Sequence, residues 1–367
     1  MDASAPSDAV APPGGKRFPC ARCGAKLEFA PRTSALKCPY CGHENPIPES
    51  GAAVEELDFL AHLEAFAAAE PTHERETLKC DACGAEIHKP PQIEALSCPY
   101  CGSNIVAMAA SRRLIKPRAL LPFKIERDEA QARFRHWLGK LWFAPDAVKQ
   151  YARVEQRLTG LYVPYWTYDC HTTSAYTGER GEHYYVTVGS GKNRRTQRRT
   201  RWYPASGVVR NRFNDVLVLA SRSLPRRCAE RLEPWDLRSL APYDDAYLSG
   251  FTAEGYQIDL AGGFEVARGI MDETIEATVR ADIGGDEQRI HSVDTRYADI
   301  TFKHVLLPVW ISAYRYKQRV YRFLVNARTG EVQGERPYSW VKIALVVLAG
   351  LSAAAAAWWL AQQYGAW

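Results

Sequence analysis

Eight cysteines form four Cys-x-x-Cys pairs within the first 101 residues of this 367-residue chain. The pairs are Cys20/Cys23, Cys38/Cys41, Cys80/Cys83 and Cys98/Cys101. Fourteen residues separate the two pairs in each set, and the second set repeats the first at a shift of 60 positions. About half of the 22 aligned positions are identical. The pattern predicts an internal duplication of one small module.

Two thiolates separated by two residues on a tight turn can chelate one metal ion. A glycine follows each pair (Gly24, Gly42, Gly84, Gly102), and glycine adopts turn conformations that a side chain hinders. Two such turns supply four sulfurs in a tetrahedron, which suits Zn²⁺ and leaves no open position for a substrate. We therefore predict two structural zinc ribbons whose folding depends on the ion. Iron–sulfur ligation, disulfides and redox pairs are the alternatives.

The amino-acid composition of the whole chain excludes several classes of protein. With 46% hydrophobic, 24% charged and 11% aromatic residues, the chain is not disordered throughout. Ten cysteines are too few for a small disulfide scaffold of this length. The net charge of +5 is mild and does not by itself imply a nucleic-acid partner.

The two predicted ribbons differ in charge. Six basic and two acidic residues lie between Lys16 and Asn45, whereas two basic and three acidic residues lie in the second ribbon. Only the first can attract phosphate groups. Tyr40 and Tyr100 occupy equivalent positions and can stack on bases, but such a tyrosine more often packs against its own hairpin. We favour protein docking or domain spacing over nucleic-acid binding by the ribbons.

The end of the sequence predicts a membrane anchor. Ile343–Ala361 is a 19-residue apolar run, and no charged residue follows its start. At 1.5 Å per residue the run spans about 28 Å, close to the thickness of a bilayer core. Trp358 and Trp359 lie near its end, where aromatic rings prefer the headgroup level. A buried hairpin helix is the alternative, because five consecutive alanines make the run only moderately hydrophobic.

Charge and cysteine chemistry predict which side of the membrane holds the rest of the chain. Arg336 and Lys342 precede the apolar run and no basic residue follows it, which places the N-terminal side in the cytoplasm. Zinc ligation needs the reduced thiols of that compartment. The N-terminal stretch has neither the basic start nor the apolar centre of a signal peptide. We expect a single-pass protein of the inner (cytoplasmic) membrane with its bulk in the cytoplasm.

The middle of the chain predicts a mixed α+β domain. Helices are expected at 54–69 as a spacer between the ribbons, after a capping box at Asp128 and Gln131, and at 262–281. The second of these has an apolar stripe typical of core packing, formed by Phe134, Trp137, Leu138, Leu141 and Trp142. Residues rich in β-branched and aromatic types predict strands at 161–169, 184–188, 300–307, 309–315 and 321–326.

A basic segment lies between two strand-like stretches, and we interpret it as a mobile hairpin tip. Its basic residues are Lys192, Arg194, Arg195, Arg198, Arg199 and Arg201. A solvated loop is the plain alternative. As a binding site, the segment favours anionic lipid, at about 1 kcal/mol per basic residue, or an acidic protein partner, ahead of nucleic acid.

Catalytic motifs are not evident in the sequence. It lacks a Gly-Lys-Ser/Thr phosphate loop, His-Glu-x-x-His and Gly-x-Ser-x-Gly, so we expect neither a helicase nor an ATPase, and no enzyme. Cys170 and His171 are neighbours on a strand and should point to opposite faces. A site assembled by the fold stays open, for instance from His171, His183, Asp244, His291 or His304.

Motifs along the chain resemble a bacterial family. Both ribbons end in Cys-Pro-Tyr-Cys-Gly, and VPYWTYD (163–169), YTGERG (176–181), LEPWDL (232–237), DIGGDEQRI (282–290), FKHVLLPVW (302–310) and RPYS (336–339) follow. Over nearly its whole length the chain resembles membrane-anchored tandem zinc-ribbon proteins, labelled TFIIB-type zinc-ribbon protein or primosomal protein N′-like, without the helicase motor. Some members are encoded beside SPFH-domain and phage-shock-type membrane-stress proteins. The resemblance implies an adaptor that brings such partners to the inner membrane.

The predicted organisation is an α+β fold with two N-terminal four-cysteine zinc ribbons and one C-terminal transmembrane helix. The predicted segments are a disordered tail (1–17), ribbon 1 (18–45), a linker with a helix (46–77), ribbon 2 (78–106), the α+β domain (107–338) and the membrane helix (342–363). Two functions compete. One is a non-enzymatic, membrane-tethered adaptor that binds proteins and anionic lipid. The other is a nucleic-acid-binding accessory protein of replication or transcription that uses the basic ribbon and segment 191–201. No small-molecule substrate is evident.

Overall fold

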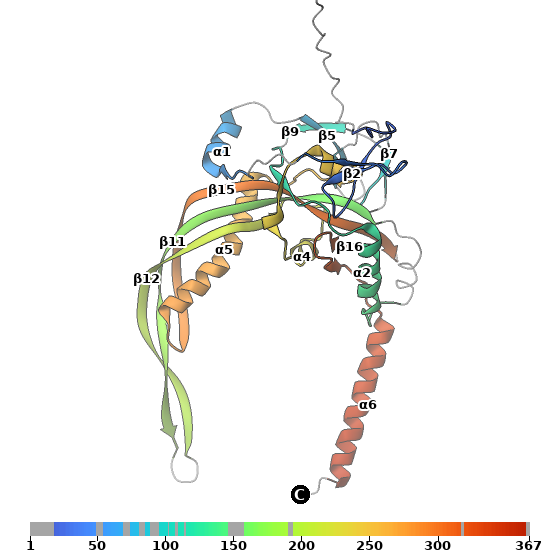
Figure 1. The fold of residues 1–367 in the computed structure, drawn as a ribbon. Helices are drawn as coiled ribbons and strands as arrows, with labels where there is room; N and C mark the ends of the chain where they lie inside the picture. Colours follow the sequence, from blue (N-terminus) through green and yellow to red (C-terminus); the bar gives the residue numbers. More distant parts are fainter. Residues whose placement is uncertain are drawn as a thin grey trace, which may run out of the picture.

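The computed structural model describes residues 18–48, 54–68, 74–80, 85–88, 95–101, 103–106, 109–113, 115–145, 158–189, 194–316 and 319–364. The predicted tail at 1–17 lies outside this part of the chain. The described residues form a mixed α+β fold, as predicted, in which one large sheet holds the other elements together (Figure 1).

Three long strands form the centre of the sheet in the order β12-β11-β15. They are β11 (Thr159–Val188), β12 (Arg195–Leu219) and β15 (Glu287–Tyr316), and both pairings are antiparallel. The predicted division into strands at 161–169 and 184–188, and at 300–307 and 309–315, is wrong. Each of these pairs of segments belongs to a single strand.

Two β-bulges explain how the long strands continue through polar segments. The register of β11 with β12 shifts between Tyr168 and Cys170, and its register with β15 shifts between Asp169 and His171. Opposite these points, Asp215 and Asp299 adopt left-handed φ angles of 55° and 52°, which aspartate tolerates better than most residues. A bulge bends a strand without ending its pairing, and the sheet curves into the arch of Figure 1.

Shorter strands extend the sheet around β15. β10 pairs in parallel with β15, and β16 and β17 form a hairpin beside it. The bounds are β4 (Leu57–Asp58), β10 (Ala119–Leu120), β13 (Ala241–Pro242), β14 (Thr252–Ala253), β16 (Arg319–Asn326) and β17 (Val332–Gly334). The short helices are α4 (Arg226–Glu230), η2 (Leu237–Ser239) and η3 (Asp245–Leu248). The strand predicted at 321–326 lies within β16.

Helix α5 (Leu260–Ile283) packs on the long strands and confirms the helix predicted at 262–281. The Asp259 carboxylate accepts a hydrogen bond from the Gly262 N–H (2.8 Å) and caps the first turn. Residues at helical spacing are buried against the sheet: Leu260, Phe264, Ala267, Met271, Ile275, Val279 and Ile283. A β-carbon at position 263 would lie 2.4 Å from the Tyr168 hydroxyl, so Gly263 allows the helix to approach the strands closely.

Both faces of the sheet are covered where the two cysteine modules pack against it. Consecutive side chains of β11 point to opposite faces. Tyr162 belongs to the apolar cluster that contains Phe29 of the first module, whereas Leu161 belongs to the cluster that contains Ile87 of the second. The modules therefore pack from opposite faces, which explains why residues 160–168 are buried without interruption.

The segment between the modules is attached to the sheet. Helix α1 spans Phe59–Ala68, so the helix predicted at 54–69 begins later than expected. The two residues before it form β4, which pairs antiparallel with β15. Phe59 is buried and its ring contacts those of Tyr168 and Phe302. These contacts replace the interpretation of this helix as a plain spacer.

An ionic cluster at the bulges fixes the same segment. Lys303 Nζ lies 2.8 Å from Glu56 Oε1, 2.8 Å from Asp215 Oδ1 and 3.9 Å from Asp169 Oδ2, and the lysine side chain is 8% exposed. The hydrogen bond from Lys303 lowers the pKa of Glu56. Burial raises the pKa of Asp169 to about 6. One buried cation thus holds three carboxyl groups from three parts of the chain.

Helix α2 (Arg127–Gly139) confirms the predicted helix but not its predicted start. Glu126 is the N-cap residue and no side chain caps this end, so the capping box at Asp128 and Gln131 is wrong. The buried members of the predicted stripe are Phe134, Leu138 and Leu141. Trp142 is 72% exposed, because it follows the end of the helix, where helical spacing no longer sets its direction.

Replacing Lys303 with methionine tests the ionic cluster. We expect Lys303→Met to lower the free energy of unfolding by about 3 kcal/mol at pH 7, because the carboxylates lose their shared cation. Urea unfolding of the detergent-solubilised chain, followed by tryptophan fluorescence, measures the change. Arg268→Met is the control, since its ion pair with Glu265 is exposed and should contribute less than about 1 kcal/mol. Equal effects of the two variants would contradict the stabilising role of Lys303.

Candidate metal centres and membrane-facing elements

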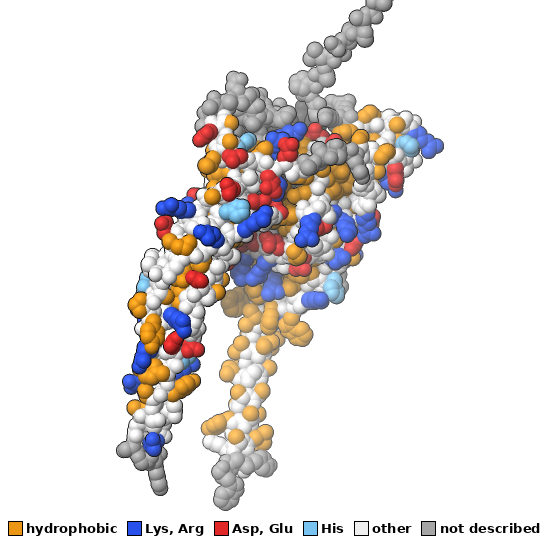
Figure 2. Space-filling view, turned by 60° about the vertical axis from the view of Figure 1, so that its left-hand side comes forward, with side chains coloured by type: hydrophobic (Ala, Val, Ile, Leu, Met, Phe, Trp, Pro, Cys, Tyr) orange, Lys and Arg blue, Asp and Glu red, His pale blue; other side chains and the backbone are white. Residues whose placement is uncertain are grey.

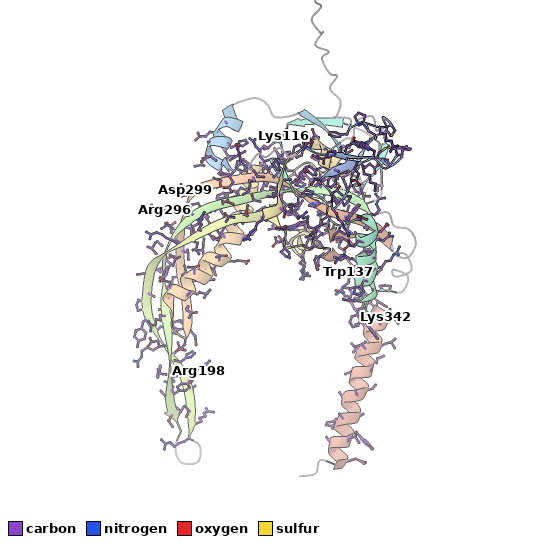
Figure 3. The ribbon with its side chains drawn as sticks, in the orientation of Figure 1. Lys116, Trp137, Arg198, Arg296, Asp299 and Lys342 are labelled. Carbon is purple, nitrogen blue, oxygen red and sulfur yellow. The ribbon has the colours of Figure 1, made fainter. Side chains whose placement is uncertain are left out.

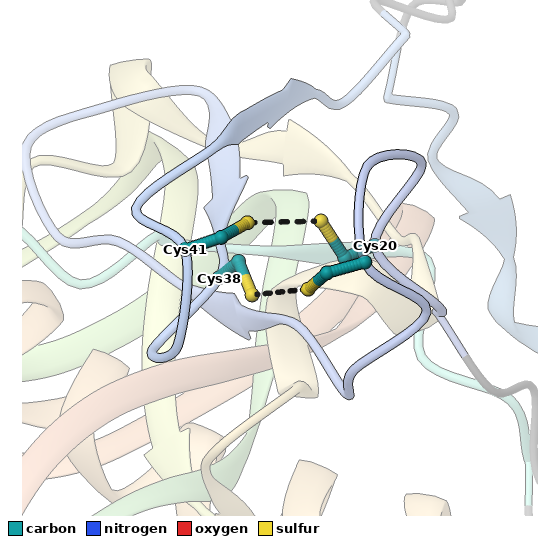
Figure 4. Close-up of side chains that lie close together, drawn as sticks. Cys20, Cys38 and Cys41 are labelled. Carbon is teal, nitrogen blue, oxygen red and sulfur yellow. Dashed lines mark hydrogen bonds between the residues drawn. The ribbon is translucent and has the colours of Figure 1, made fainter.

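The four cysteines of the first module (residues 18–48) converge on one point. The module is a three-stranded antiparallel sheet of β1 (Glu28–Phe29), β2 (Ala35–Lys37) and β3 (Glu44–Pro46). The Sγ atoms of Cys20, Cys23, Cys38 and Cys41 lie within 4.8 Å of one another. Figure 4 shows two of the sulfur pairs, Cys20–Cys41 at 3.6 Å and Cys23–Cys38 at 3.5 Å.

Two similar turns orient these cysteine sulfurs toward one another. In the first, the Cys20 N–H donates to the Ala25 carbonyl (2.8 Å) and the Gly24 N–H donates to the Cys20 carbonyl (2.9 Å). The second turn repeats both bonds around Cys38 and Gly42. The two glycines have φ angles of 74° and 71°, where a side chain would be strained.

The sulfur spacing fits a tetrahedral Zn²⁺ ion. Zn–S bonds of about 2.3 Å place the sulfurs of a tetrahedron about 3.8 Å apart, close to the 3.5 Å and 3.6 Å observed. A disulfide would need about 2.05 Å. Four thiolates fill the coordination shell, so a bound ion would supply structural cross-linking at this centre.

Backbone donors favour the thiolate form that a metal requires. Burial opposes ionisation of Cys20, but the N–H groups of Arg22 and Cys23 outweigh it and lower the pKa of this thiol to about 6. The N–H of Cys41 is the main cause that lowers the pKa of Cys38. Two of the four sulfurs, those of Cys20 and Cys38, are thereby favoured as thiolates.

The second module (residues 74–113) repeats this arrangement as far as it is described. Its strands are β5 (Glu74–Lys79), β6 (Glu86–His88), β7 (Ala95–Ser97), β8 (Asn104–Val106) and β9 (Ala109–Arg113). The Sγ atoms of Cys80, Cys98 and Cys101 lie within 4.8 Å of one another. Cys83 lies outside the described residues. The three described sulfurs and the repeated sequence indicate a second candidate metal centre.

Equivalent tyrosines of the two modules lie in opposite environments. Tyr40 is 84% exposed, whereas Tyr100 is fully buried. The expectation that such a tyrosine packs against its own hairpin is wrong for Tyr40. Tyr40 projects into solvent, and the Tyr100 hydroxyl donates a hydrogen bond to Glu254 Oε2 (2.5 Å) of the sheet domain.

Glu254 is the buried acceptor that anchors the second module. The Ser221 hydroxyl donates to its other carboxyl oxygen (2.8 Å), and burial raises the pKa of Glu254 to about 7. Ile87 forms a β-bridge with the same residue. On the opposite side, Arg322 Nε donates to the Tyr100 carbonyl (2.9 Å). The tyrosine–glutamate contact is not evident in the sequence, because its partners are 154 residues apart.

The histidines proposed as a fold-assembled site are spread over the sheet. His291 and His304 are thirteen positions apart on β15, or about 43 Å at 3.3 Å per residue. His183 lies 2.7 Å from Glu287. His304 is buried, and its Nδ1 lies 2.9 Å from the Ile115 carbonyl.

The other two candidate residues are also separate. The Asp244 carboxylate accepts a hydrogen bond from the Ala246 N–H (2.8 Å) and so caps η3. His171 is exposed and its ring lies 3.3 Å from Asp299, whereas its neighbour Cys170 is buried, which confirms their opposite directions. The described residues thus do not bring the five candidates together.

The basic segment lies at the end of a two-stranded arm. β15 pairs with β11 only as far as Gly181, and beyond it β11 and β12 pair with each other alone. We call residues 182–201 the arm. Its described arginines, at positions 194, 195, 198, 199 and 201, are exposed, and Figure 3 labels Arg198 there. Lys192 lies outside the described residues.

Aromatic side chains accompany these arginines. In the register of the arm, Tyr184 lies opposite Arg199 and Tyr185 lies opposite Arg198. Tyr185 is 69% exposed, and the Arg201 guanidinium lies 5.2 Å from the centre of the Tyr184 ring. Figure 2 shows basic and hydrophobic side chains interspersed along the arm. The surface of the arm therefore combines tyrosine rings with arginine cations, a combination that suits a lipid headgroup region.

The C-terminal helix α6 (Trp340–Tyr364) is long and apolar enough to span a membrane. Its apolar stretch has no buried residue in the structure. The hydroxyl of Ser352 donates to the Leu348 carbonyl (2.9 Å) within the helix, so this polar group needs no water. Length and composition alone support a membrane span here.

An aromatic collar surrounds the start of α6. Trp142, Phe143, Tyr338 and Trp340 are all exposed. The Ser339 N–H donates to the Phe143 carbonyl (2.8 Å), and Lys342, labelled in Figure 3, donates to the Ala144 carbonyl (3.0 Å). These bonds join two segments about 200 residues apart in sequence. Trp340 could have been recognised from the sequence as an aromatic residue at the start of the apolar run. Trp142 had been assigned to the core.

Comparison with known proteins adds one relative. The chain is 27% identical over 343 residues to the uncharacterized protein YdjG of Bacillus subtilis, which covers 89% of this chain and 92% of the relative. No protein-family profile and no solved structure matches the chain. The similarity to YdjG spans most of both proteins, so it involves more than the cysteine modules.

Metal content tests the two candidate centres. We expect about two zinc ions per chain in purified, metal-replete protein, measured by inductively coupled plasma mass spectrometry. Cys38→Ser and Cys98→Ser should each remove about one ion, because each deletes one ligand of a different centre. Cys228→Ser is the matched control and should retain both. Less than one tightly bound zinc in the unmodified chain would contradict the assignment.

Removing single hydroxyl groups tests the different packing of the two modules. Tyr100→Phe should lower the free energy of unfolding by about 1–3 kcal/mol, because buried Glu254 loses a donor. Tyr40→Phe, at the equivalent exposed position, should change it by less than about 0.5 kcal/mol. Urea titration of the zinc-loaded variants measures both. A Tyr100→Phe protein of unchanged stability would show that the hydroxyl does not anchor the module.

Proposed function

We propose that this chain is a non-enzymatic adaptor of the inner (cytoplasmic) membrane, tethered by α6, with the bulk of the chain in the cytoplasm. The observation that carries the proposal is the apolar helix α6, which the rest of the described chain does not cover. Exposed apolar surface of this extent marks a membrane or protein contact. The collar at its start and Trp358 and Trp359 near its end match the aromatic belts of membrane-spanning helices.

The two cysteine modules are, in this proposal, structural zinc ribbons. The four sulfurs of the first module form a closed set, and the three described sulfurs of the second converge in the same way. The ions would therefore hold the modules in shape and take no part in a reaction. The second ribbon is built into the sheet domain through Tyr100 and Glu254. The first exposes its metal-binding end and offers a surface to partners.

The arm supports a further contact with the anionic membrane surface. In Figure 1 the arm and α6 leave the sheet on the same side and reach a similar level. Each arginine near an anionic surface contributes about 1 kcal/mol. Tyrosine rings favour the same depth in the headgroup region. An arm that touches the membrane would fix the domain at a second point.

Insertion of α6 requires a change in its direction relative to the arm. The arm is a two-stranded ribbon with unpaired edges, which hydrocarbon does not tolerate. Each arginine at the bilayer centre would also cost about 2.5–3.5 kcal/mol. We infer that α6 changes its direction relative to the arm when it enters the bilayer, so that the arm lies along the headgroups. This change would break the bonds from Ser339 and Lys342 to Phe143 and Ala144.

The position of the first ribbon suits an adaptor. Figure 1 places β2 on the side of the sheet away from the free end of α6, which would face the cytoplasm. The partners that the family resemblance suggests are SPFH-domain or phage-shock-type membrane-stress proteins. A membrane-fixed domain with an outward ribbon would recruit such proteins to the bilayer.

Deletion and charge removal test the two membrane contacts. The full chain should sediment with membranes and resist carbonate extraction, whereas a chain lacking residues 340–367 should not. The truncated chain should still bind phosphatidylglycerol vesicles. Changing Arg195, Arg198 and Arg199 to glutamine should weaken that binding roughly a hundredfold, from about 1 kcal/mol each. Arg226→Gln, Arg268→Gln and Arg280→Gln together form the control. A full chain that stays soluble without detergent would contradict the tether.

Affinity purification from detergent-solubilised membranes tests the adaptor role. We expect SPFH-domain or phage-shock-type proteins to co-purify with the full chain and to resist nuclease treatment. The alternative function is a nucleic-acid-binding accessory protein that uses the first ribbon and the arm. Co-purification that nuclease abolishes would favour this alternative and contradict the adaptor.

A further inference from the structure

The duplication repeats one knuckle, Cys-Pro-Tyr-Cys-Gly, in two environments. Around Tyr100, the knuckle is buried against the sheet domain. Around Tyr40, the same residues lie at the surface: Pro39, Tyr40, Gly42 and His43 are all exposed. The buried copy therefore shows, within this chain, what kind of surface such a knuckle fits.

That surface has three chemical features. A carboxyl group, Glu254, accepts a hydrogen bond from the Tyr100 hydroxyl. A cation, Arg322, donates to the Tyr100 carbonyl. Apolar residues of the sheet domain, including Leu224 and Leu232, belong to the same cluster as the tyrosine ring. The knuckle thus docks by its ring and hydroxyl onto a carboxyl group in apolar surroundings.

The exposed copy keeps the same groups and adds positive charge. The first module is held to the domain by its other end, where the Ser249 hydroxyl donates to the Leu27 carbonyl (2.6 Å). Near the knuckle, Arg22, Lys26 and Lys37 are exposed, and no ion pair engages them among the described residues. In the same part of the chain, no hydrogen bond engages the Tyr40 hydroxyl. An acidic ligand that bound here would meet a hydrogen-bond donor, the Tyr40 hydroxyl, and the positive charge of the three cations.

We propose that the knuckle around Tyr40 binds an acidic segment of a partner protein. The Tyr40 hydroxyl donates to an Asp or Glu carboxylate of that segment, as Tyr100 donates to Glu254, and the three nearby cations attract it. This inference rests on the adaptor function proposed above and names its binding surface. A protein ligand is favoured over nucleic acid because Glu44, opposite Lys37 in the register of β2 with β3, offsets one of the three exposed charges, which leaves little to hold several phosphates.

Photo-crosslinking in cells tests the site. The full chain carries p-benzoylphenylalanine in place of His43, which leaves Tyr40 intact, and a second version carries it in place of Arg226 as an exposed control. We expect position 43 alone to form an adduct with a protein segment that contains Asp or Glu beside the cross-linked residue. Tyr40→Phe should reduce the adduct about tenfold. Adducts with nucleic acid or lipid, no adduct specific to position 43, or an adduct indifferent to Tyr40→Phe would overturn the proposal.

A binding cycle with the captured segment completes the test. The segment is synthesised with its native acid and with the matching Gln or Asn, and each peptide is titrated against the zinc-loaded full chain and its Tyr40→Phe variant in detergent. Either change should raise the Kd about tenfold, and the second should add little to the first. Additive effects would overturn the proposed contact. Membrane fractionation, done in parallel, reports on the tether alone, so failure of the tether and failure of this site are distinguishable.

Discussion

The antiparallel pairing of β11 with β15 is the interaction on which the other parts of the structure depend. It runs from Thr159 opposite Ile311 to Gly181 opposite Glu287, and different elements pack against each part of it. At the Thr159 end both faces are buried by the two cysteine modules; further along, α5 covers one face. Beyond Gly181 the third strand ends and the arm continues with two. An isolated two-stranded ribbon is marginally stable in water, which fits the proposed contact of the arm with the membrane surface.

Local chemistry was predictable from the sequence wherever it depends on residues close together. The cysteine spacing predicts the converging sulfurs because each turn is determined by five or six consecutive residues. The helix near 262–281 is equally local, since its buried face repeats at helical spacing and Asp259 caps its start. The apolar run at the end of the chain required only a count of residues.

The features that sequence reasoning missed depend on contacts between distant segments. Tyr100 is buried because Glu254 accepts its hydrogen bond, and nothing beside Tyr40 differs enough in sequence to indicate the contrast. The long strands seemed interrupted because polar residues such as Asp169 and His171 resemble a turn, whereas the structure places β-bulges there. Trp142 matched the helical stripe but follows the end of α2, and only the hydrogen bond from Ser339 to the neighbouring Phe143 reveals that this segment meets the start of α6. Each error treats a tertiary contact as a local pattern.

The two cysteine modules illustrate how duplication can divide one task into two. A cysteine knuckle that docks on a carboxyl group is a small contact whose shape a bound metal would maintain, so it would need little ordering on binding. One copy now makes that contact within the chain and is no longer available to others. The other copy, held at its far end by Ser249, presents the same groups outward. Because the internal contact contains a buried carboxyl group, its formation depends on a matched donor rather than on apolar area alone. The same requirement at Tyr40 would let the exposed copy select an acidic partner segment and reject a merely hydrophobic one.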